Sequence, residues 1–112
     1  MKRIAYAEEW LTTDDRVADL VLEYARALAQ HDTADTVTVP VLDDGGHVHH
    51  AQFLIGPASQ IIVVESDELP PADFDVSEVR NELSARLERL TSPRPVPYDD
   101  GEGAAERLPE EY

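Results

Sequence analysis

The sequence predicts a two-layer α+β fold, in which two helices lie on one face of a three-stranded antiparallel sheet. Two stretches carry apolar residues at the three- and four-residue spacing of an amphipathic helix. Between them lie three short runs rich in β-branched residues, separated by segments that contain Gly, Pro, Asp or Ser. The predicted order is therefore helix, three strands, helix.

The first predicted helix covers about residues 14–31. Thr12 and Asp15 have the spacing of a capping box at its start, with Asp in place of the usual Glu. Asp14 and Asp15 also place negative charge near the positive end of the helix dipole. A single apolar stripe runs along this helix and consists of Val17, Leu20, Val21, Tyr24 and Leu28.

The second predicted helix covers about residues 76–90. Asp75 is expected to cap it, and Glu78 completes a capping box three residues later. Phe74 stands where a hydrophobic staple against Val79 needs it. Its apolar stripe consists of Val76, Val79, Leu83, Leu87 and Leu90. Both helices are amphipathic, so each needs a sheet to cover its apolar side.

The first two predicted strands form a hairpin. Residues 36–41 alternate with a period of two, and Pro40 within them favours an edge position in the sheet. Asp43-Asp44-Gly45-Gly46 is typical of a type I turn followed by a left-handed glycine. The second strand then covers residues 47–55, and we expect Val41 to pair toward His47. This pairing places Val37, Val39, Val41, Ala51, Phe53 and Ile55 on the helix-facing side.

The third predicted strand covers residues 60–65, whose unbroken apolar run suggests that both of its faces are covered. We therefore expect it at the centre of the sheet or at the seam of a dimer. Residues 2–7 are a candidate for an additional short N-terminal strand. Residues 1–92 form one domain in this interpretation, and residues 93–112 form an acidic, proline-containing tail that is disordered or loosely docked.

Composition excludes several classes of function. Twenty-four acidic residues against nine basic ones give a net charge of −15, so we expect neither nucleic acid nor an anionic membrane as a partner. The absence of cysteine removes disulfide scaffolds, thiolate metal sites and thiol catalysis. No apolar stretch approaches the length of a membrane span. We expect a cytoplasmic protein.

His47 and His49 are the strongest candidates for metal ligands. Alternation along a strand places both imidazoles on one face, about 6.5–7 Å apart. Such a pair can share Zn, Ni or Cu, with Asp44 or His31 as a third ligand. Histidines beside a turn of an acidic protein are more commonly solvated or paired with carboxylates, and this alternative is favoured. We therefore expect no resident cofactor, with Zn or Ni as the alternative.

No catalytic motif is present in the sequence. Ser59 follows a Gly-Pro break without the pattern of a nucleophile elbow, and is expected to be a turn residue. The acidic run between Glu65 and Glu78 lacks the glycine of a calcium-binding loop. The expectation is a protein that is not an enzyme.

The sheet face away from the helices is the predicted functional surface. Leu54, Ile62 and Val64 are the residues expected to bind a partner there. The surplus of negative charge favours a protein partner with a basic surface, and a second copy of the chain is the other partner expected. The predicted function is a small, non-catalytic interaction or adaptor module that self-associates through its sheet. The alternative is a metal- or small-ligand-binding protein that uses His47 and His49.

Overall fold

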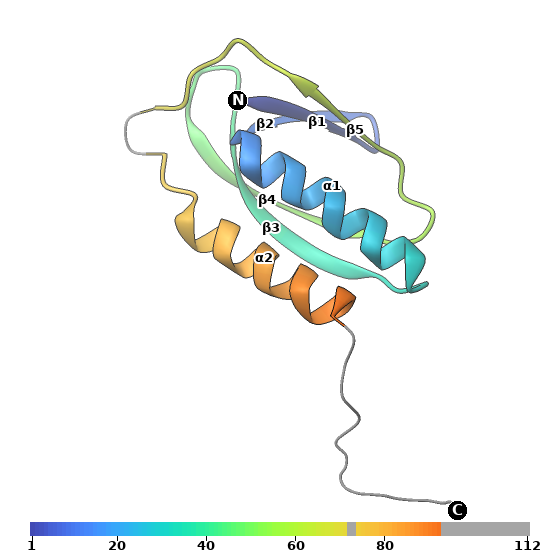
Figure 1. Ribbon diagram of the computed structural model, residues 1–112. Coiled ribbons are helices and arrows are strands. Elements are labelled where there is room, and N and C mark those ends of the chain that lie inside the picture. The colour runs from blue at the N-terminus through green and yellow to red at the C-terminus, as the bar shows by residue number, and fades with distance from the viewer. Residues whose placement is uncertain (72–73, 93–112) are drawn as a thin grey trace, which may run out of the picture.

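The computed structural model describes residues 1–71 and 74–92. They form an α+β fold of five strands and two helices (Figure 1). The predicted tail at residues 93–112 lies outside the described residues. In chain order the elements are β1 (Lys2–Tyr6), β2 (Glu9–Thr13), α1 (Asp15–Gln30), β3 (Asp35–Leu42), β4 (Val48–Ile55), β5 (Ile61–Glu65) and α2 (Ser77–Thr91).

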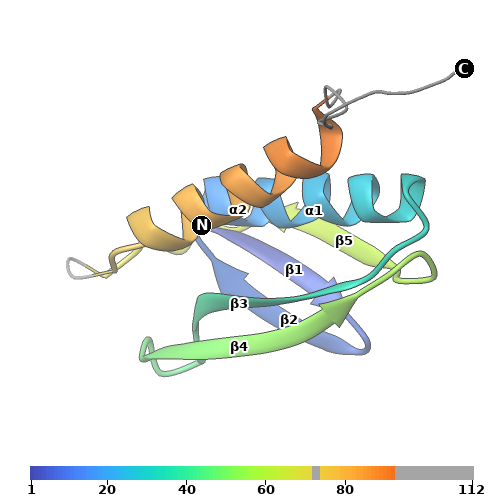
Figure 2. The ribbon, with the colours of Figure 1, turned by 90° about the horizontal axis from the view of Figure 1, so that it is seen from below.

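Both helices lie on the same face of the sheet, and no described segment covers the other face (Figure 2). The α+β class and the two-layer arrangement are therefore confirmed. The predicted three-stranded sheet is wrong, because the sheet has five antiparallel strands in the order β4-β3-β2-β1-β5. Strand β1 is the additional strand suggested at residues 2–7. Strand β2 was not predicted, because its five residues show no clear alternation.

Two predicted strand positions are wrong. Strand β5 lies at an edge, so the central position expected for it is wrong, while the alternative position at the seam of a dimer stays a prediction. Its apolar run is covered on one face only, since Ile61 and Val63 pack against the core while Ile62 and Val64 are exposed. Strand β3 lies between β4 and β2, although Pro40 predicted an edge. The register pairs β2 with β3 only at Thr12 and Leu42, so Pro40 stands outside that ladder.

The hairpin between β3 and β4 is confirmed, with a shifted register. Gly46 has φ +81°, and its N–H donates to the Asp43 carbonyl at 3.0 Å, as a turn with a left-handed glycine requires. Val41 pairs with His49 and not with His47, because Asp43 and His47 already form the pair that closes the turn. The shift is two residues, so the predicted helix-facing side of the hairpin is unchanged.

The helix starts differ from the predicted caps. Asp14, and not Thr12, is the N-cap of α1, and its carboxylate accepts hydrogen bonds from the N–H groups of Arg16 and Val17. Thr12 is instead a residue of β2. The N-cap position of α2 is Val76, which has no capping side chain, while the Asp75 carboxylate accepts from the Ser77 N–H.

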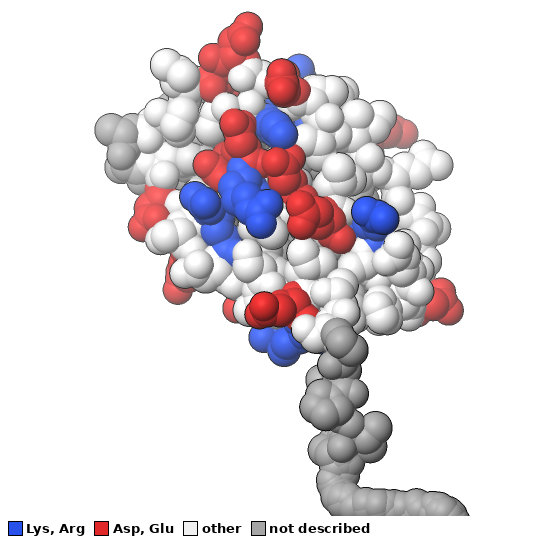
Figure 3. Space-filling view, viewed as in Figure 1, with Lys and Arg blue, Asp and Glu red and all other residues white. Residues whose placement is uncertain are grey.

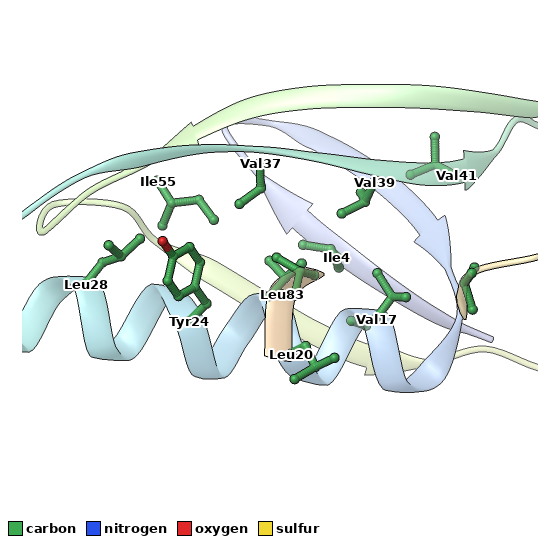
Figure 4. Close-up of a cluster of buried hydrophobic side chains, with 13 residues drawn as sticks. Ile4, Val17, Leu20, Tyr24, Leu28, Val37, Val39, Val41, Ile55 and Leu83 are labelled. Carbon is green, nitrogen blue, oxygen red and sulfur yellow. The ribbon is translucent and has the colours of Figure 1, made fainter. Parts of the chain in front are cut away.

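The core fills the space between the helices and the sheet (Figure 4). Tyr24 of α1 and Leu83 of α2 lie on the side of the strands, near Val37, Val39 and Ile55. Leu20 belongs to the same core and lies on the side of α1 away from these three residues. Each residue of the predicted α1 stripe is buried. The members of this core are Ile4, Val17, Ala18, Leu20, Val21, Tyr24, Leu28, Val37, Val39, Val41, Ile55, Val76 and Leu83.

The sheet is curled, and Tyr6 fixes the curl. Tyr6 lies on β1, three places from β4 in the strand order. In a flat sheet those strands are about 14 Å apart, farther than a tyrosine side chain reaches. The Tyr6 ring nevertheless lies 5.3 Å from the Phe53 ring, and its hydroxyl donates to the Leu54 carbonyl. Curling is also what allows the short connection at residues 56–60 to join two opposite edges of the sheet.

The β1–β2 turn is strained. Tyr6 pairs with Glu9, so Ala7 and Glu8 are the only turn residues, and their φ angles are +52° and +71°. Two consecutive left-handed residues define a type I′ turn, which Asn-Gly adopts more readily than Ala-Glu. The missing Asn or Gly is the reason why the sequence did not reveal this hairpin.

Helix α2 is tied to β3 by a polar cluster. The Arg86 guanidinium donates to the Asp35 carboxylate at 3.0 Å and to the Thr36 carbonyl at 2.9 Å. The Tyr24 hydroxyl donates to the same carboxylate at 2.6 Å. Burial and the Asp35 carboxylate raise the pKa of Tyr24 to about 12, while the Tyr24 hydrogen bond helps to lower the pKa of Asp35. The cluster therefore joins a neutral phenol, a carboxylate and a guanidinium across α1, β3 and α2.

Replacing Ala7 by Asn and Glu8 by Gly together should stabilise the protein by about 1–2 kcal/mol, because both residues then accept positive φ readily. Chemical denaturation of the full chain measures the effect. Ala58→Gly is the control, because Ala58 is an exposed turn residue without positive φ. It should lower stability slightly through the greater entropy of the unfolded chain. Equal effects in both proteins would contradict the strain at residues 7 and 8.

Arg86→Met should lower the free energy of unfolding by about 1 kcal/mol, because Asp35 and the Thr36 carbonyl lose a charged donor at a partly exposed position. Arg89 lies three residues further along the same helix. Arg89→Met should change the free energy of unfolding by a few tenths of a kcal/mol at most. Thermal unfolding of the two variants beside the original chain makes the comparison. A larger loss in Arg89→Met would show that the cluster does not anchor α2.

Candidate functional site

The sheet face opposite the helices, called the open face below, differs in charge from the rest of the chain. The pairing register and the alternation of burial place every second strand residue on it. None of these residues is Asp or Glu, although the chain has 24 acids. They are Arg3, Ala5, Trp10, Thr12, Thr36, Thr38, Pro40, Leu42, Val48, His50, Gln52, Leu54, Ile62 and Val64.

The helix-bearing side shows the opposite character. Figure 3 shows acidic and basic side chains crowded over α1 and α2. Several of them are paired there, including Lys2 with Asp19 at 2.9 Å and Arg16 with Glu23 at 3.7 Å. The carboxylates of the described strands and helices thus lie on the helix side, and none lies at an open-face strand position.

A hollow of about 700 Å³ lies at one end of the open face. Leu54 of β4 and Ile62 of β5 stand on its walls, Ala5 and Tyr6 of β1 line it, and the connection between β4 and β5 closes one side. Leu54 and Ile62 are 60% and 59% exposed. The curl of the sheet brings these two edge strands to one site, because β4 and β5 are the outermost strands in the order.

The three residues predicted to bind a partner are all on the open face. Leu54 and Ile62 line the hollow, and Val64 lies two residues further along β5 and is 38% exposed. Tyr6 also lines the hollow, and its hydroxyl lies 3.3 Å from the Ser59 hydroxyl. Ser59 is a turn residue as predicted, since its hydroxyl accepts the Gly56 N–H at 2.9 Å.

An apolar row that the sequence did not reveal crosses the sheet beside the hollow. Ala5 pairs with Ile62 on one side and with Trp10 on the other, so a small residue lies between two large ones. Trp10 is 49% exposed, and the Arg3 guanidinium lies 4.5 Å from its ring centroid. This row depends on the pairing of β1 with β2, so it cannot be predicted from a sequence in which that hairpin is not recognised.

One acidic residue, Glu8, stands at the rim of the hollow. Glu8 lines it from the β1–β2 turn, and Glu9 follows at the start of β2. Both are exposed. The site therefore combines an apolar floor and walls with negative charge at one end.

His47 and His49 face one carboxylate. The Asp43 carboxylate lies 3.5 Å from Nδ1 of His47 and 2.8 Å from Nε2 of His49. It also accepts the N–H groups of Gly45 and His47, so it holds the turn together. Asp44 and His31 are not among these contacts. Within residues 1–71 and 74–92, no group of three His, Cys, Asp or Glu side chains is arranged to hold a metal. A Zn or Ni site here stays a prediction.

Comparison of the chain with protein-family models, with curated proteins and with solved structures gives no match. In the part of the chain that the structure describes, neither helix has the length and apolar character needed to cross a membrane.

Acid should loosen the β3–β4 turn between about pH 4 and pH 2. The His47 N–H and the His49 imidazole are the largest causes that lower the pKa of Asp43 to about 2. A carboxyl group with a lowered folded pKa contributes stability that is present above its unfolded value, near 4, and is lost as the pH falls toward 2. NMR titration of the Asp43 side chain measures its midpoint directly. A midpoint near the ordinary value for Asp would contradict the contacts described.

Proposed function

We propose that this protein is a non-catalytic interaction module, which binds a partner protein through the hollow and the apolar row of its open face. The observation that carries the proposal is the charge distribution of the sheet. A chain with a net charge of −15 carries no carboxylate at the open-face strand positions. These positions present Trp10, Leu54, Ile62 and Val64 to solvent instead.

Burial of these side chains supplies the affinity. Full burial of a Leu or Ile side chain is worth about 1.5–3 kcal/mol, and Leu54 and Ile62 still expose more than half of their surface. The small Ala5 side chain leaves room between Ile62 and Trp10 for an inserted apolar group. An anchor seated in such a pocket commonly dominates the binding energy of an interface.

Charge selects the partner. Glu8 lines the hollow, and the chain as a whole is strongly acidic. A partner that presents apolar side chains flanked by Lys or Arg is attracted during approach and paired at the rim. Its association rate should therefore fall as salt is added.

Leu54→Asp should abolish capture of this partner, because it places a charge on the wall of the hollow. Immobilised full-length protein, exposed to lysate of the source cells, is the assay. Gln52→Asp is the matched control, since Gln52 lies on the same strand and the same face, two residues away, and does not line the hollow. Thermal unfolding checks that both variants are folded.

The expected result is a basic protein retained by the original chain and by Gln52→Asp, and lost from Leu54→Asp and at high salt. Titration of that protein should then show at least a tenfold loss of affinity in Leu54→Asp, or about 1.4 kcal/mol. Two results would contradict the proposal. One is capture of the same proteins by the original chain and by both variants, and the other is a captured protein whose affinity does not change with salt concentration.

A further inference from the structure

We propose that a second surface, formed by the outer edge of β5 and the adjacent flank of α1, pairs with the same surface of a second copy of this chain across a two-fold axis. This surface shares Ile62 with the hollow and is otherwise separate from it. The inference does not depend on the proposed function, although both surfaces border the open face at β5.

Strand β5 is an edge strand without the usual protection against pairing. Residues 61–64 contain no charged residue and no proline, two of the features that normally block strand addition, and the one charged residue of the strand, Glu65, is its last. No described segment runs along its outer edge (Figure 1). The other edge strand, β4, differs, because it carries His49, His50 and Gln52 and its Leu54 carbonyl already accepts the Tyr6 hydroxyl.

The absence of charge at residues 61–64 of β5 favours a copy of the same chain over a basic partner as the occupant of this edge. A surface that meets itself across a two-fold axis cannot be complementary if it carries a charge of one sign. In an antiparallel pair centred on Val63, all five residues of β5 find a partner within the opposite β5. Ile62 then lies beside Val64 of the second copy, and Glu65 lies beside Ile61 and not beside another carboxylate.

Helix α1 extends this edge into the helix layer. It packs over β5 and lies between β5 and α2 (Figure 1). Arg16 and Leu20 line a separate groove between α1 and α2. At 100° per residue, Leu22 lies about 120° around the helix from Arg16 and about 160° from Leu20. Leu22 is therefore on the flank above the β5 edge. It is 41% exposed, and the residues three and four positions from it on the helix are Ala18, Asp19, Ala25 and Arg26, so one acid and one base stand beside it.

The pairing of two sheets through β5 would bring the two α1 flanks toward each other on the helix side. The Leu22 side chains then bury apolar surface that the single chain leaves in water. Backbone hydrogen bonds between the strands alone cover less area than a stable dimer requires, about 1,200 Å² in total, so the helix flank is a necessary part of the interface.

The net charge sets the salt dependence of this contact. Two copies of charge −15 repel each other, and salt screens that repulsion over about 8 Å at physiological ionic strength. Self-association should therefore strengthen as salt is added. Capture of a basic partner at the hollow should weaken under the same change, which separates the two surfaces in one series of measurements.

Sedimentation equilibrium of the full chain tests the proposal with two substitutions. The original protein is expected to be a dimer at about 100 µM, and Leu22→Glu should raise the dissociation constant of the dimer at least tenfold. Leu69→Glu is the matched control, because Leu69 is 84% exposed and lies outside the proposed surface. It should leave the dissociation constant unchanged.

Cross-linking tests the pairing of the strands. The chain has no cysteine, so Ile62→Cys and Val64→Cys each introduce a single thiol. Oxidation of a mixture of the two variants should give a covalent dimer in higher yield than oxidation of either variant alone. A monomeric original chain, a dimer insensitive to Leu22→Glu, or equal cross-linking of the mixture and the single variants would each overturn the proposal.

A substitution in the hollow should not affect the dimer. Leu54→Asp lies on β4, at the opposite edge of the sheet, and should keep the dimer while it loses the captured partner. Leu22→Glu should keep the partner and lose the dimer. Each variant therefore reports on one surface, and failure of one proposal does not imply failure of the other.

Discussion

The contact between Tyr6 and the end of β4 is the constraint on which the rest of the structure depends. The connection of residues 56–60 joins β4 to β5, which are opposite edges of the sheet. A flat five-stranded sheet would be too wide for such a short link to turn and cross it comfortably. Tyr6 holds the curled form, because its ring packs on Phe53 and its hydroxyl donates to the Leu54 carbonyl. The hollow between Leu54 and Ile62 follows from that curl.

The helices and the β3–β4 hairpin were predictable because their signals are local. An apolar stripe of 3.6-residue period, and a turn containing two glycines, specify their elements without help from distant residues. The predicted bounds of α1, residues 14–31, differ from the observed Asp15–Gln30 by one residue at each end. The faces of the hairpin were also predicted, although its register was wrong by two residues.

The N-terminal hairpin was not predictable in the same way. Ala7 and Glu8 adopt left-handed angles that neither residue favours, so no turn signal marks the break between β1 and β2. Ladders on both sides hold these angles: β1 pairs with β2 along five residues and with β5 along five more. The pairing of β1 with its two neighbouring strands therefore decides the conformation of this turn. Strand β5 lies at the edge because β1 is its only neighbour in the sheet.

The residues of the candidate site also fall into those that local sequence patterns predict and those that depend on tertiary pairing. Leu54, Ile62 and Val64 were found from sequence, because alternation alone assigns a strand residue to one face or the other. Trp10, Ala5 and Arg3 were not, because their place beside Ile62 and Val64 depends on the strand order. An apolar run such as residues 61–64 is consistent with a buried central strand or with an edge that has one covered face, and periodicity does not distinguish the two.

The distribution of acidic residues gives a physical reason for two separate surfaces. Carboxylates at open-face positions would have cost the fold little, since these side chains are mostly in water, and the chain has acids in abundance. Their exclusion therefore requires an explanation other than the stability of the single chain. A surface that becomes buried on binding supplies it, because an unpaired carboxylate there would lose its hydration without compensation. In the proposed dimer, residues 61–64 of β5 and Leu22 would also be buried, and the one carboxylate of β5, on Glu65, stands at the end of the strand.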